Sequence, residues 1–426
     1  MHDVRAIGVV PGGVAGVQRA GGMVAGDWVF LTGHLAGDLV GGLDPRATEP
    51  AGLPTHAGRQ SRREGEVILG RLAALLEEAG SDLAHAVRLD QYYPTWRAVD
   101  PYHQARKAMF GSYIPPSTSV LMDETLIAGA TMDVSLMAVR KDGGRKPVRA
   151  QPKDVPVPEF SGFVPAISVG DYVFVAGQMA NDASMDRLDP RATKPAVALW
   201  NGTEIRLQTD FLIRHRLKPA LEAAGSSLGN AIKAQVYLSD IADAADFLDV
   251  WNAHFGANPC ALSIVPTSGF GFSNGIIEIN ILGVRDDGAI RKEIIAEDLP
   301  RGAAFGPAAV RAGDLLCLSA LVAADDSGTM VPPALISQLR YSGGGAARQM
   351  EAILDMAERV CAAGGTSLDR VVRAHHFLTD LHDYPAMLLA WAGRLGDRPL
   401  PCGAIGVPGP MPVPGCTTMM DMWAFV

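Results

Sequence analysis

This chain has few cysteines, no long apolar run and no excess of basic charge. Five cysteines occur among 426 residues, the first of them at Cys260. An odd and unpatterned set of this kind argues against a disulfide framework, so we expect reduced, buried thiols. No apolar run is long enough to cross a bilayer, which argues against a membrane partner. The formal net charge of −9 argues against a nucleic-acid partner, because a phosphate backbone attracts a basic face.

The amino-terminal segment also lacks a targeting pattern. Met1–Arg5 does not have the basic-then-apolar order of a secretory signal, and we expect a cytoplasmic protein. The adjacent pair His375-His376 lies in a predicted strand, where neighbouring side chains point to opposite faces. This arrangement does not favour a shared metal ion, and we expect neither a metal nor a cofactor. A length of 426 residues exceeds one ordinary domain.

A threefold internal repeat organises the chain. A helix that ends in Ala-Gly or Gly-Gly and leads into a strand occurs three times, with Gly80, Gly225 and Gly365 spaced 145 and then 140 residues apart. The basic residues of the following strands, Arg88, Lys233 and Arg373, keep the same two spacings. We interpret these three basic residues as structural. The repeat predicts three domains of about 140 residues each, a usual domain size.

Each repeat has the same predicted order of elements. A Gly-Asp turn opens an aromatic and β-branched strand within residues 26–34, 170–178 and 313–321. Apolar residues at helical spacing follow, as from Ile68 to Leu76. In the second repeat this pattern contains Pro219, where we expect the helix to kink or to begin again.

A further strand, a second helix and two closing strands complete each repeat. The resulting order is ββαβαββ, an α+β arrangement with helices on one face of a sheet. We expect domains at residues 1–145, 155–290 and 300–426, joined by linkers near residues 141–155 and 286–300.

Several stretches of the second repeat resemble signatures of the RidA family, also called YjgF/YER057c/UK114. They are the strand Val173–Gln178, which ends in Gly-Gln, the segments Leu221–Leu228 and Ile232–Asp240, and the pair Glu278-Ile279. The resemblance extends over nearly the whole chain and is weakest in the third repeat. It implies three tandem chorismate-mutase-like domains that form an intramolecular pseudo-trimer, with a central β-barrel and helices outside. One chain would then equal one family trimer, and the sequence leaves a higher oligomer open.

The resemblance also implies an activity, namely hydrolysis of a reactive enamine or imine with release of ammonia in a cleft between neighbouring units. In the family, a glutamate on the last strand helps to orient the water. That acidic position is matched here by Asp133, Glu278 and Asp421. We predict these three residues, together with His34, as catalytic. His34 replaces the glutamine of Gly-Gln, and an imidazole suits proton transfer near neutral pH.

The arginine that holds the substrate carboxylate in the family is not matched. Its place in a Pro-Ala-Arg-Ser/Thr stretch is taken by Thr118 in the first repeat, by Ala261 or Ser263 in the second, and by Gly403 in the third. We therefore expect the usual carboxylate anchor to be missing from all three clefts. The residues that we predict to bind substrate are Gln178, Thr118, Ser119 and Ser263.

Two further arginines are candidates for the missing guanidinium. Arg46 and Arg191 lie in the hexapeptide Leu-Asp-Pro-Arg-Ala-Thr, which the first two repeats share. A surface turn built on Asp-Pro is the alternative explanation of that hexapeptide. Cys260 and Cys402 follow the same proline of their repeats, and we interpret them as inert buried thiols because no activating base lies nearby in the sequence.

Three functions remain open from the sequence. The first is a diverged hydrolase of C=N or C–N bonds, acting on a small metabolite at a cleft between domains. The second is a non-catalytic protein with degenerate clefts that binds a small molecule or another partner. The third is a cyclic-amide hydrolase, which depends on a Ser–Lys pair in each of three domains; the serines here do not keep a common register.

Overall fold

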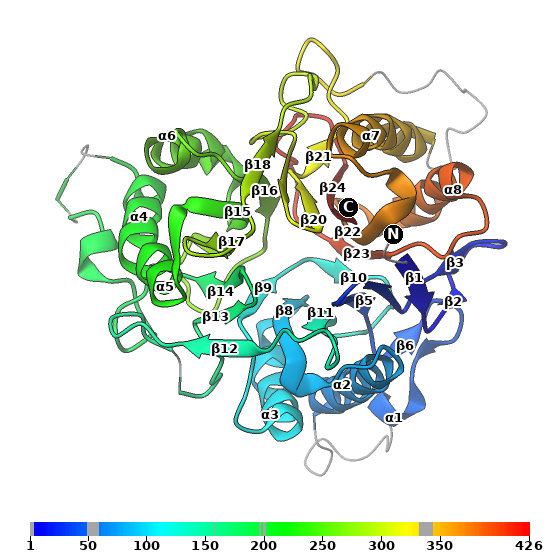
Figure 1. Ribbon diagram of the computed structural model, residues 1–426, viewed down its shortest axis with the longest axis horizontal. Helices are drawn as coiled ribbons and strands as arrows, with labels where there is room; N and C mark the ends of the chain where they lie inside the picture. Colours follow the sequence, from blue (N-terminus) through cyan, green and yellow to red (C-terminus); the bar gives the residue numbers. More distant parts are fainter. Residues whose placement is uncertain (1–3, 49–58, 158, 196, 199–201, 332–343) are drawn as a thin grey trace.

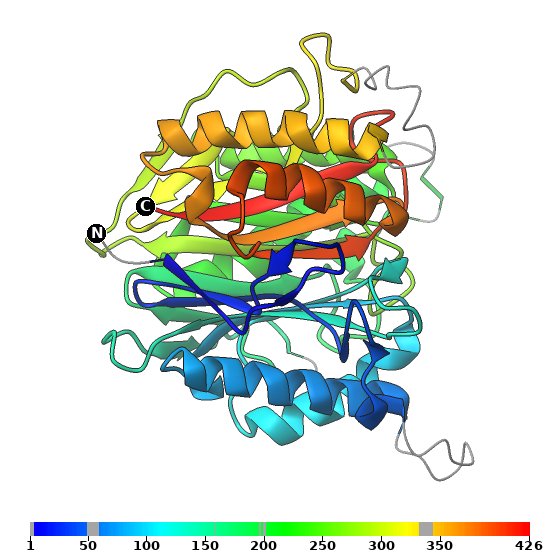
Figure 2. The same ribbon diagram turned by 90° about the vertical axis from the view of Figure 1, so that its right-hand side faces the viewer.

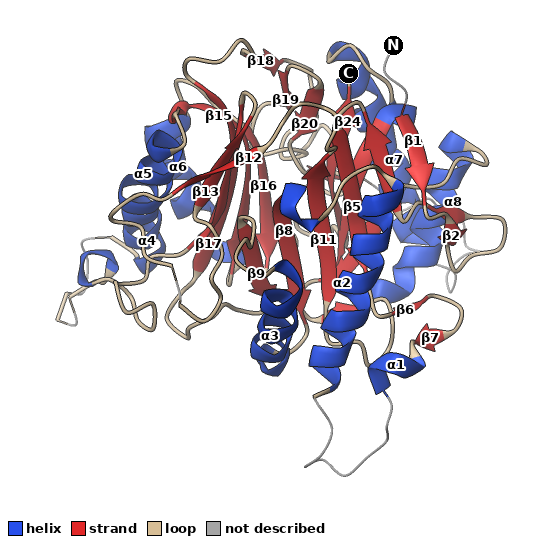
Figure 3. Ribbon diagram, turned by 60° about the horizontal axis from the view of Figure 1, so that its bottom comes forward, coloured by secondary structure: helices blue, strands red, loops and turns tan. Residues whose placement is uncertain are grey.

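Three β-sheets surround the centre of the molecule, and the helices lie outside them (Figures 1 and 3). The computed structural model describes residues 4–48, 59–157, 159–195, 197–198, 202–331 and 344–426. The first three residues of Met1–Arg5, discussed above as a targeting segment, lie outside these ranges. None of the helices within them is both long enough and apolar enough to cross a membrane.

The first sheet has six strands in the order β1-β4-β5-β11-β8-β9. Two long helices cover its outer face, and two short hairpins lie beside it (Figures 1 and 2). The elements are β1 (Val4–Ile7), β2 (Val10–Pro11), β3 (Gln18–Arg19), β4 (Gly22–Ala25), β5 (Trp28–His34), β6 (Gly37–Asp38), β7 (Gly42–Leu43), α1 (Pro45–Thr48), α2 (Gln60–Glu78), β8 (Ala86–Tyr93), α3 (Val99–Phe110), β9 (Ser117–Leu121) and β11 (Asp133–Val139).

The second sheet also has six strands, in the order β12-β13-β14-β17-β15-β16. Its first strand comes from the segment that we predicted as a linker, and it pairs antiparallel with the next strand. The elements are β12 (Pro147–Ala150), β13 (Ala166–Val169), β14 (Tyr172–Gln178), α4 (Glu204–Leu212), α5 (Lys218–Ala223), β15 (Ser226–Leu238), α6 (Ala244–Phe255), β16 (Ala261–Pro266) and β17 (Ile277–Arg285).

The third sheet has eight strands and takes one of them from the first repeat. The path is β10-β23-β22-β24-β20-β19-β18, and β21 pairs with β24. Here too a predicted linker supplies an edge strand, β18. The elements are β10 (Glu124–Thr125), β18 (Lys292–Ile295), β19 (Ala309–Ala312), β20 (Leu315–Leu318), β21 (Leu321–Val322), α7 (Gly344–Ala363), β22 (Val371–Leu378), α8 (Tyr384–Leu395), β23 (Cys402–Gly406) and β24 (Thr418–Phe425).

The break predicted at Pro219 is present. A π-helical turn, Ile213–Leu217, separates α4 from α5, and Pro219 stands in the first turn of α5. Proline has no N–H to donate to the carbonyl of His215, four residues earlier. That carbonyl instead accepts a hydrogen bond from the Arg216 guanidinium, with an Nη1–O distance of 3.0 Å.

The three sheets share one pairing pattern. Strands β8, β15 and β22 each pair parallel with the strand that follows the second helix and antiparallel with the last strand of the repeat. In the parallel pairs, Asp90 lies opposite Thr118, Gln235 opposite Ser263, and His375 opposite Gly403. The register thus selects Ser263, and not Ala261, as the equivalent of Thr118 and Gly403.

The antiparallel register corrects one predicted equivalence. Glu278 lies opposite Tyr237 and Asp133 opposite Tyr92, whereas the matching Phe377 lies opposite Met419. Asp421 lies two residues further along β24, so its predicted equivalence to Glu278 and Asp133 is wrong. Residues two apart on a strand point to the same face, and for this reason the alternation in the sequence does not reveal the shift.

An apolar core shared by all three sheets fills the centre at one end of the strands. Its large side chains include Trp28, Tyr172 and Trp423, all of which are buried. The indole of Trp28 meets the Tyr172 ring edge-on, with 5.1 Å between ring centroids. This core holds the repeats together because each sheet buries an apolar face against the other two.

Sparse backbone hydrogen bonds join the sheets at their seams. The Leu121 N–H donates to Gly269 (2.9 Å), the Ala320 N–H to Leu262 (3.0 Å) and the Leu400 N–H to Gln18 (2.9 Å). Strand pairing nevertheless leaves separate sheets. The expected central β-barrel is therefore not closed. We call the boundaries between the first and second, second and third, and third and first sheets the first, second and third seam.

Candidate functional site

A cavity of about 370 Å³ opens at the first seam. Strand β9 and helix α3 form one wall, and the ends of β14 and β17 form the other. Pro156, residues 160–163 and residues 270–272 close its sides. Three of the predicted site residues line this cavity: Ser119, Gln178 and Glu278.

Glu278 is one of two acidic residues that line the cavity, the other being Asp100. Its side chain is 5% exposed, and burial raises the pKa of its carboxyl to about 8, although a hydrogen bond from the Ser119 N–H acts in the opposite direction and the charge of Asp90 adds to the rise. A Cβ on Gly177 would lie 1.9 Å from Glu278 Oε1. The glycine of Gly-Gln therefore leaves the space that the carboxyl occupies.

Arg106 of α3 also lines the cavity, and the sequence analysis missed it. Its Nη1 donates to Gln91 Oε1 (2.6 Å) and to Ser117 Oγ (3.3 Å), and its Nη2 donates to the Ser161 carbonyl (2.8 Å). Its Nε is buried without a hydrogen-bond partner among the described residues. Burial lowers the pKa of Arg106, and no carboxylate offsets that effect. The first-seam cavity thus contains a guanidinium, although the motif position itself carries Thr118.

A comparison of the three repeats could have identified Arg106 from the sequence. Trp251 and Trp391 occupy the matching helix positions, 145 and then a further 140 residues along the chain. An arginine at a position that is tryptophan in both other repeats, on the inner face of an amphipathic helix, departs from the apolar pattern. A buried cation without a carboxylate is costly and hence points to a functional role.

His103 is also a polar residue at a helix position that is apolar in the other two repeats. Its equivalents are Leu248 and Leu388, at the same two spacings. Its imidazole lines the cavity, is 8% exposed, and has a buried Nε2 without a described hydrogen-bond partner. Burial, followed by the charge of Arg106, lowers the pKa of His103 well below its usual value. The neutral ring adds a hydrogen-bonding group to the cavity at neutral pH.

The remaining predicted site residues lie outside this cavity. Thr118 turns away from it, and its hydroxyl accepts a hydrogen bond from Asn280 Nδ2 at 2.9 Å. Arg46 and Arg191 each pair with the aspartate of their own hexapeptide, at 2.7 and 2.8 Å, and their side chains are 70% and 60% exposed. These contacts agree with the interpretation of the hexapeptide as a turn.

Two predicted catalytic residues lie at the third seam. His34 Nε2 lies 2.7 Å from the Gly21 carbonyl, and burial lowers the pKa of His34 to about 4. Asp133 is fully buried without a described hydrogen-bond partner, and burial raises its pKa to about 7. Arg19 occupies this seam, and its Nη2 donates to the Cys402 carbonyl at 2.8 Å. Gly403 packs against the backbone of Gly33.

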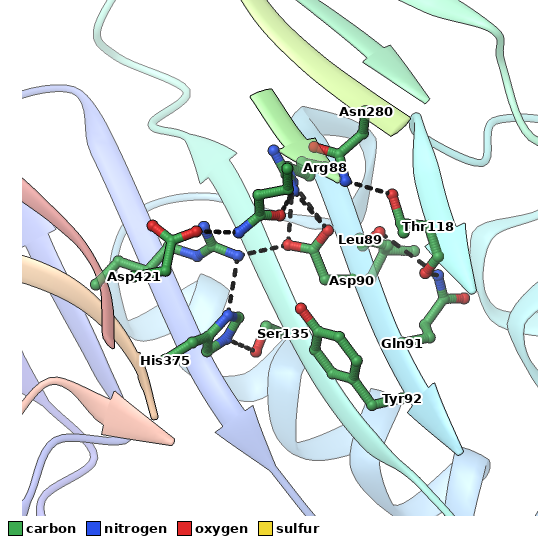
Figure 4. A network of polar contacts seen from close by, with 12 residues as sticks. Arg88, Leu89, Asp90, Gln91, Tyr92, Thr118, Ser135, Asn280, His375 and Asp421 are labelled. Carbon is green, nitrogen blue, oxygen red and sulfur yellow. Dashed lines mark hydrogen bonds and ion pairs between the residues drawn. The ribbon is translucent and has the colours of Figure 1, made fainter. Parts of the chain in front are cut away.

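A buried polar network crosses the centre of the molecule (Figure 4). Asp90 accepts hydrogen bonds from Arg88 Nε, 2.9 Å from its Oδ1, and from Arg373 Nη2, 2.6 Å from its Oδ2. His375 Nε2 lies 2.9 Å from Ser135 Oγ, whereas the His376 ring packs against Tyr384. The adjacent histidines thus point to opposite sides, as predicted from strand geometry.

The predicted residues Asp421 and Ser263 belong to the same network. Asp421 forms an ion pair with Lys233 (Nζ–Oδ1 3.0 Å) and accepts a hydrogen bond from Gln235 (Oδ2–Nε2 2.5 Å). Ser263 Oγ donates to Asp421 (3.0 Å) and accepts from Lys233 Nζ (2.7 Å). The charge of Lys233 holds the pKa of Asp421 below its usual range, against the effect of burial. These contacts support a structural role for the repeated basic residues.

The five cysteines are free and buried, as expected. Burial raises the pKa of Cys260 to about 11 and raises that of Cys402 as well. Thiols with raised pKa values are poor nucleophiles. Within the described parts of the chain, histidine, cysteine and acidic side chains form no cluster that could hold a metal ion.

Comparison with known proteins finds one matching family model and several proteins of similar sequence. The sequence model of the Endoribonuclease L-PSP family matches residues 156–284. A RutC family protein of Pyrococcus abyssi is 35% identical over 103 residues, which are 24% of this chain and 71% of that protein. A RutC family protein of Saccharolobus solfataricus is 32% identical over 102 residues, again 24% of this chain and 71% of that protein.

Solved structures similar to this chain include RidA from the Antarctic bacterium Psychrobacter sp. and Escherichia coli TdcF with bound serine. The first is 23% identical and covers 32% of this chain and 98% of its own, with a TM-score of 0.27. The second is 20% identical and covers 33% of this chain and 99% of its own, also with a TM-score of 0.27. The sequence identity to the RutC family proteins, over most of their length, decides the relationship: this chain belongs to the RutC/RidA (YjgF/YER057c/UK114) family.

Proposed function

We propose that this chain hydrolyses the C=N bond of a 2-imino acid, or of its enamine tautomer, in the first-seam cavity. The observation that carries the proposal is the pairing of a buried, carboxylate-free arginine with a buried, protonatable glutamate in one cavity. Arg106 contacts Ser117 Oγ and Glu278 contacts the Ser119 N–H. These two serines are two residues apart on β9, about 7 Å along the strand, a span that suits a small acid.

Arg106 supplies the anchor for the substrate carboxylate. Its unpartnered Nε and its position in the cavity wall offer a charge-assisted hydrogen bond, which is stronger than a neutral one. Gln91 keeps the guanidinium oriented, since it accepts from Arg106 and donates through its Nε2 to the Thr118 carbonyl at 2.9 Å. The anchor thus comes from a helix, whereas the family motif places it on the strand at Thr118.

Glu278 supplies the proton. With a pKa of about 8, its carboxyl is mostly protonated at neutral pH and donates to the imine nitrogen. Water then attacks the iminium carbon, and the Glu278 carboxylate takes the proton that the water releases. Glu278 gives this proton to the amino group of the carbinolamine, the C–N bond breaks as ammonia leaves, and the hydroxyl returns a proton to Glu278 as the 2-oxo acid forms. Gln178 and the neutral imidazole of His103 are placed to orient the water.

We further propose that one chain corresponds to one trimer of the family, with domains at residues 1–145, 155–290 and 300–426. Three sheets with a shared pairing pattern around a common core support this proposal. Fusion of three units lets each seam diverge separately, which identical subunits do not allow.

A cyclic-amide hydrolase has weaker support. The second repeat does place Lys233 Nζ 2.7 Å from Ser263 Oγ. The equivalent positions, however, are Arg88 with Thr118 and Arg373 with Gly403. The Ser–Lys pair is not repeated, and both side chains are fully buried in the central network.

Ammonia release tests the proposed hydrolysis. An amino-acid oxidase generates the 2-imino acid in situ, and the protein should accelerate formation of ammonia and 2-oxo acid beyond the spontaneous rate. Glu278→Gln should lower kcat by about 100-fold or more, a usual contribution of a general acid. Asp133→Asn, the matched change at the third seam, should leave the rate unchanged. Equal loss in both variants, or none in Glu278→Gln, would contradict the assignment. Binding without turnover in the wild type would favour the non-catalytic alternative.

A further inference from the structure

We infer that the first-seam cavity selects 2-imino acids with a bulky aromatic side chain over those with a small one, such as the imine of alanine. The inference rests on the proposed function for its reactive group, but the selectivity is argued from the cavity wall alone. A substrate of this class places its carboxylate at Arg106, its imine at Glu278 and its ring among the aromatic residues of the wall.

Aromatic residues are concentrated in the cavity wall. Six of its 22 lining residues are aromatic, whereas aromatic residues make up 6% of the whole chain. Aromatic side chains prefer offset or edge-to-face contact with other rings, and such pairs stabilise beyond simple burial. These six are Tyr93, Trp96, Phe160, Phe163, Phe270 and Phe272.

Two of these aromatic side chains face solvent, although burial would favour the folded state. Trp96 is 67% exposed and Phe160 is 54% exposed. Among the exposed large hydrophobic side chains of the described residues, only these two are aromatic, and both line the cavity. Large apolar surface left in water at the edge of a cavity marks a site where a ligand covers it.

The polar residues of the proposed reaction and most of the aromatic residues come from different parts of the fold. Arg106, Ser117, Ser119 and Glu278 come from regular helix and strand positions. Most of the aromatic residues come from connecting segments, namely residues 160–163, which precede β13, and residues 270–272, which precede β17. Met179 and Met185, both in the wall, add flexible thioethers that adapt to a ring. Secondary structure thus fixes the reacting end, while loops shape the side-chain end.

A specificity ratio tests this inference. The wild-type kcat/KM for the phenylalanine-derived imine should exceed that for the alanine-derived imine by about 10-fold or more, a usual discrimination for an apolar pocket. Trp96→Ala and Phe160→Ala should each lower that ratio several-fold. Leu389→Ala is the matched control, because Leu389 is also 53% exposed but lies on α8, away from the cavity. Its ratio should equal that of the wild type.

Direct binding of the product acids separates this inference from the proposed function. Calorimetry on the full chain should show tighter binding of phenylpyruvate than of pyruvate, and weaker phenylpyruvate binding by Trp96→Ala. The selectivity is overturned, and hydrolysis still stands, in either of two cases. In the first, the wild type turns over the alanine-derived imine faster. In the second, Trp96→Ala and Phe160→Ala both keep the wild-type ratio of kcat/KM values. Absence of turnover with selective phenylpyruvate binding overturns hydrolysis and leaves the ligand class standing. Absence of both overturns both.

Discussion

The first and second seams have the same backbone pairing but opposite chemistry. Five positions with polar side chains line the first-seam cavity. The matching positions at the second seam are all apolar and buried. In the order of the chain, Arg106, Ser117, Ser119, Gln178 and Glu278 correspond to Trp251, Leu262, Ile264, Leu321 and Met419. A seam thus becomes core when its polar residues are replaced together, because a single remaining polar group would be left unpaired.

The third seam is intermediate between the two. It keeps an acid, Asp133, and a polar residue, His34, but has Trp391 where the first seam has Arg106. Arg19 reaches into this seam from a neighbouring hairpin and is held by the Cys402 carbonyl. Acidic residues at matching positions therefore differ in surroundings: a cavity lies beside Glu278, whereas Asp133 is fully buried near the charge of Arg19.

Converting the first seam to the chemistry of the second should have the largest effect. Arg106→Trp introduces the residue that both other repeats carry, and it removes the proposed carboxylate anchor. One charge-assisted hydrogen bond of about 3 kcal/mol corresponds to a loss of about 150-fold in kcat/KM. Arg106→Lys keeps the charge and should lose less. Steady-state kinetics with circular dichroism checks the result, and a folded Arg106→Trp variant with normal kcat/KM would exclude the anchor role.

The reverse change should destabilise the second seam. Met419→Glu places at this seam the acid that Glu278 provides at the first, but the surrounding side chains are apolar. An unpartnered buried polar group costs about 3 kcal/mol, and we expect a loss of that size in the free energy of unfolding at neutral pH. Met419→Leu is the control and should cost under about 1.5 kcal/mol. Denaturant unfolding measures both, and equal stability of the two variants would contradict the apolar description of this seam.

The glycine at the anchor position of the third seam should be required for packing. A Cβ on Gly403 would lie 2.6 Å from the Gly33 Cα, and backbone cannot move aside as a flexible side chain can. Gly403→Ala should therefore cost about 2 kcal/mol. Gly393 of α8 has no neighbour within 4 Å of an added Cβ, and Gly393→Ala should stabilise by up to about 1 kcal/mol. Thermal unfolding of the two variants should shift in opposite directions.

The smallest expected effect is a change in how the free energy of unfolding depends on pH. Glu278 has a pKa of about 8 in the folded chain, against an ordinary value of 4.5. Between these values the folded state binds more protons than the unfolded state, so stability falls as pH rises through this window and levels off above it. The loss attributable to Glu278 is about 1 kcal/mol per pH unit between pH 6 and 7. Glu278→Gln should remove that part of the pH dependence. Asp133→Asn should flatten the plot of unfolding free energy against pH only below about pH 7. Identical plots for Glu278→Gln and Asp133→Asn would argue against different surroundings of the acid at the two seams.

Much of the fold followed from local signals in the sequence. The strands after Gly26-Asp27 and Gly170-Asp171, the break at Pro219 and the opposite orientation of His375 and His376 depend on neighbours a few residues apart. Glu278, Gln178 and Ser119 were also found, because they lie within recognisable stretches of the second repeat and the strand after Pro116. The linkers were misjudged since β12 and β18 are short edge strands, and their pairing partners are not apparent from composition.

The sequence by itself determined the family and the α+β order of strands and helices, and it predicts a threefold repeat, since spacing and periodicity record elements that form from adjacent residues. Only the tertiary structure decided that the first seam holds a cavity, that Arg106 and Glu278 line this same cavity, and that Asp421 belongs to a buried network. Those facts depend on strand register and on contacts between residues more than 100 positions apart. A two-residue shift along a strand, or a cation on the inner face of a helix, changes the chemistry of a site without altering the periodic pattern from which the fold was predicted.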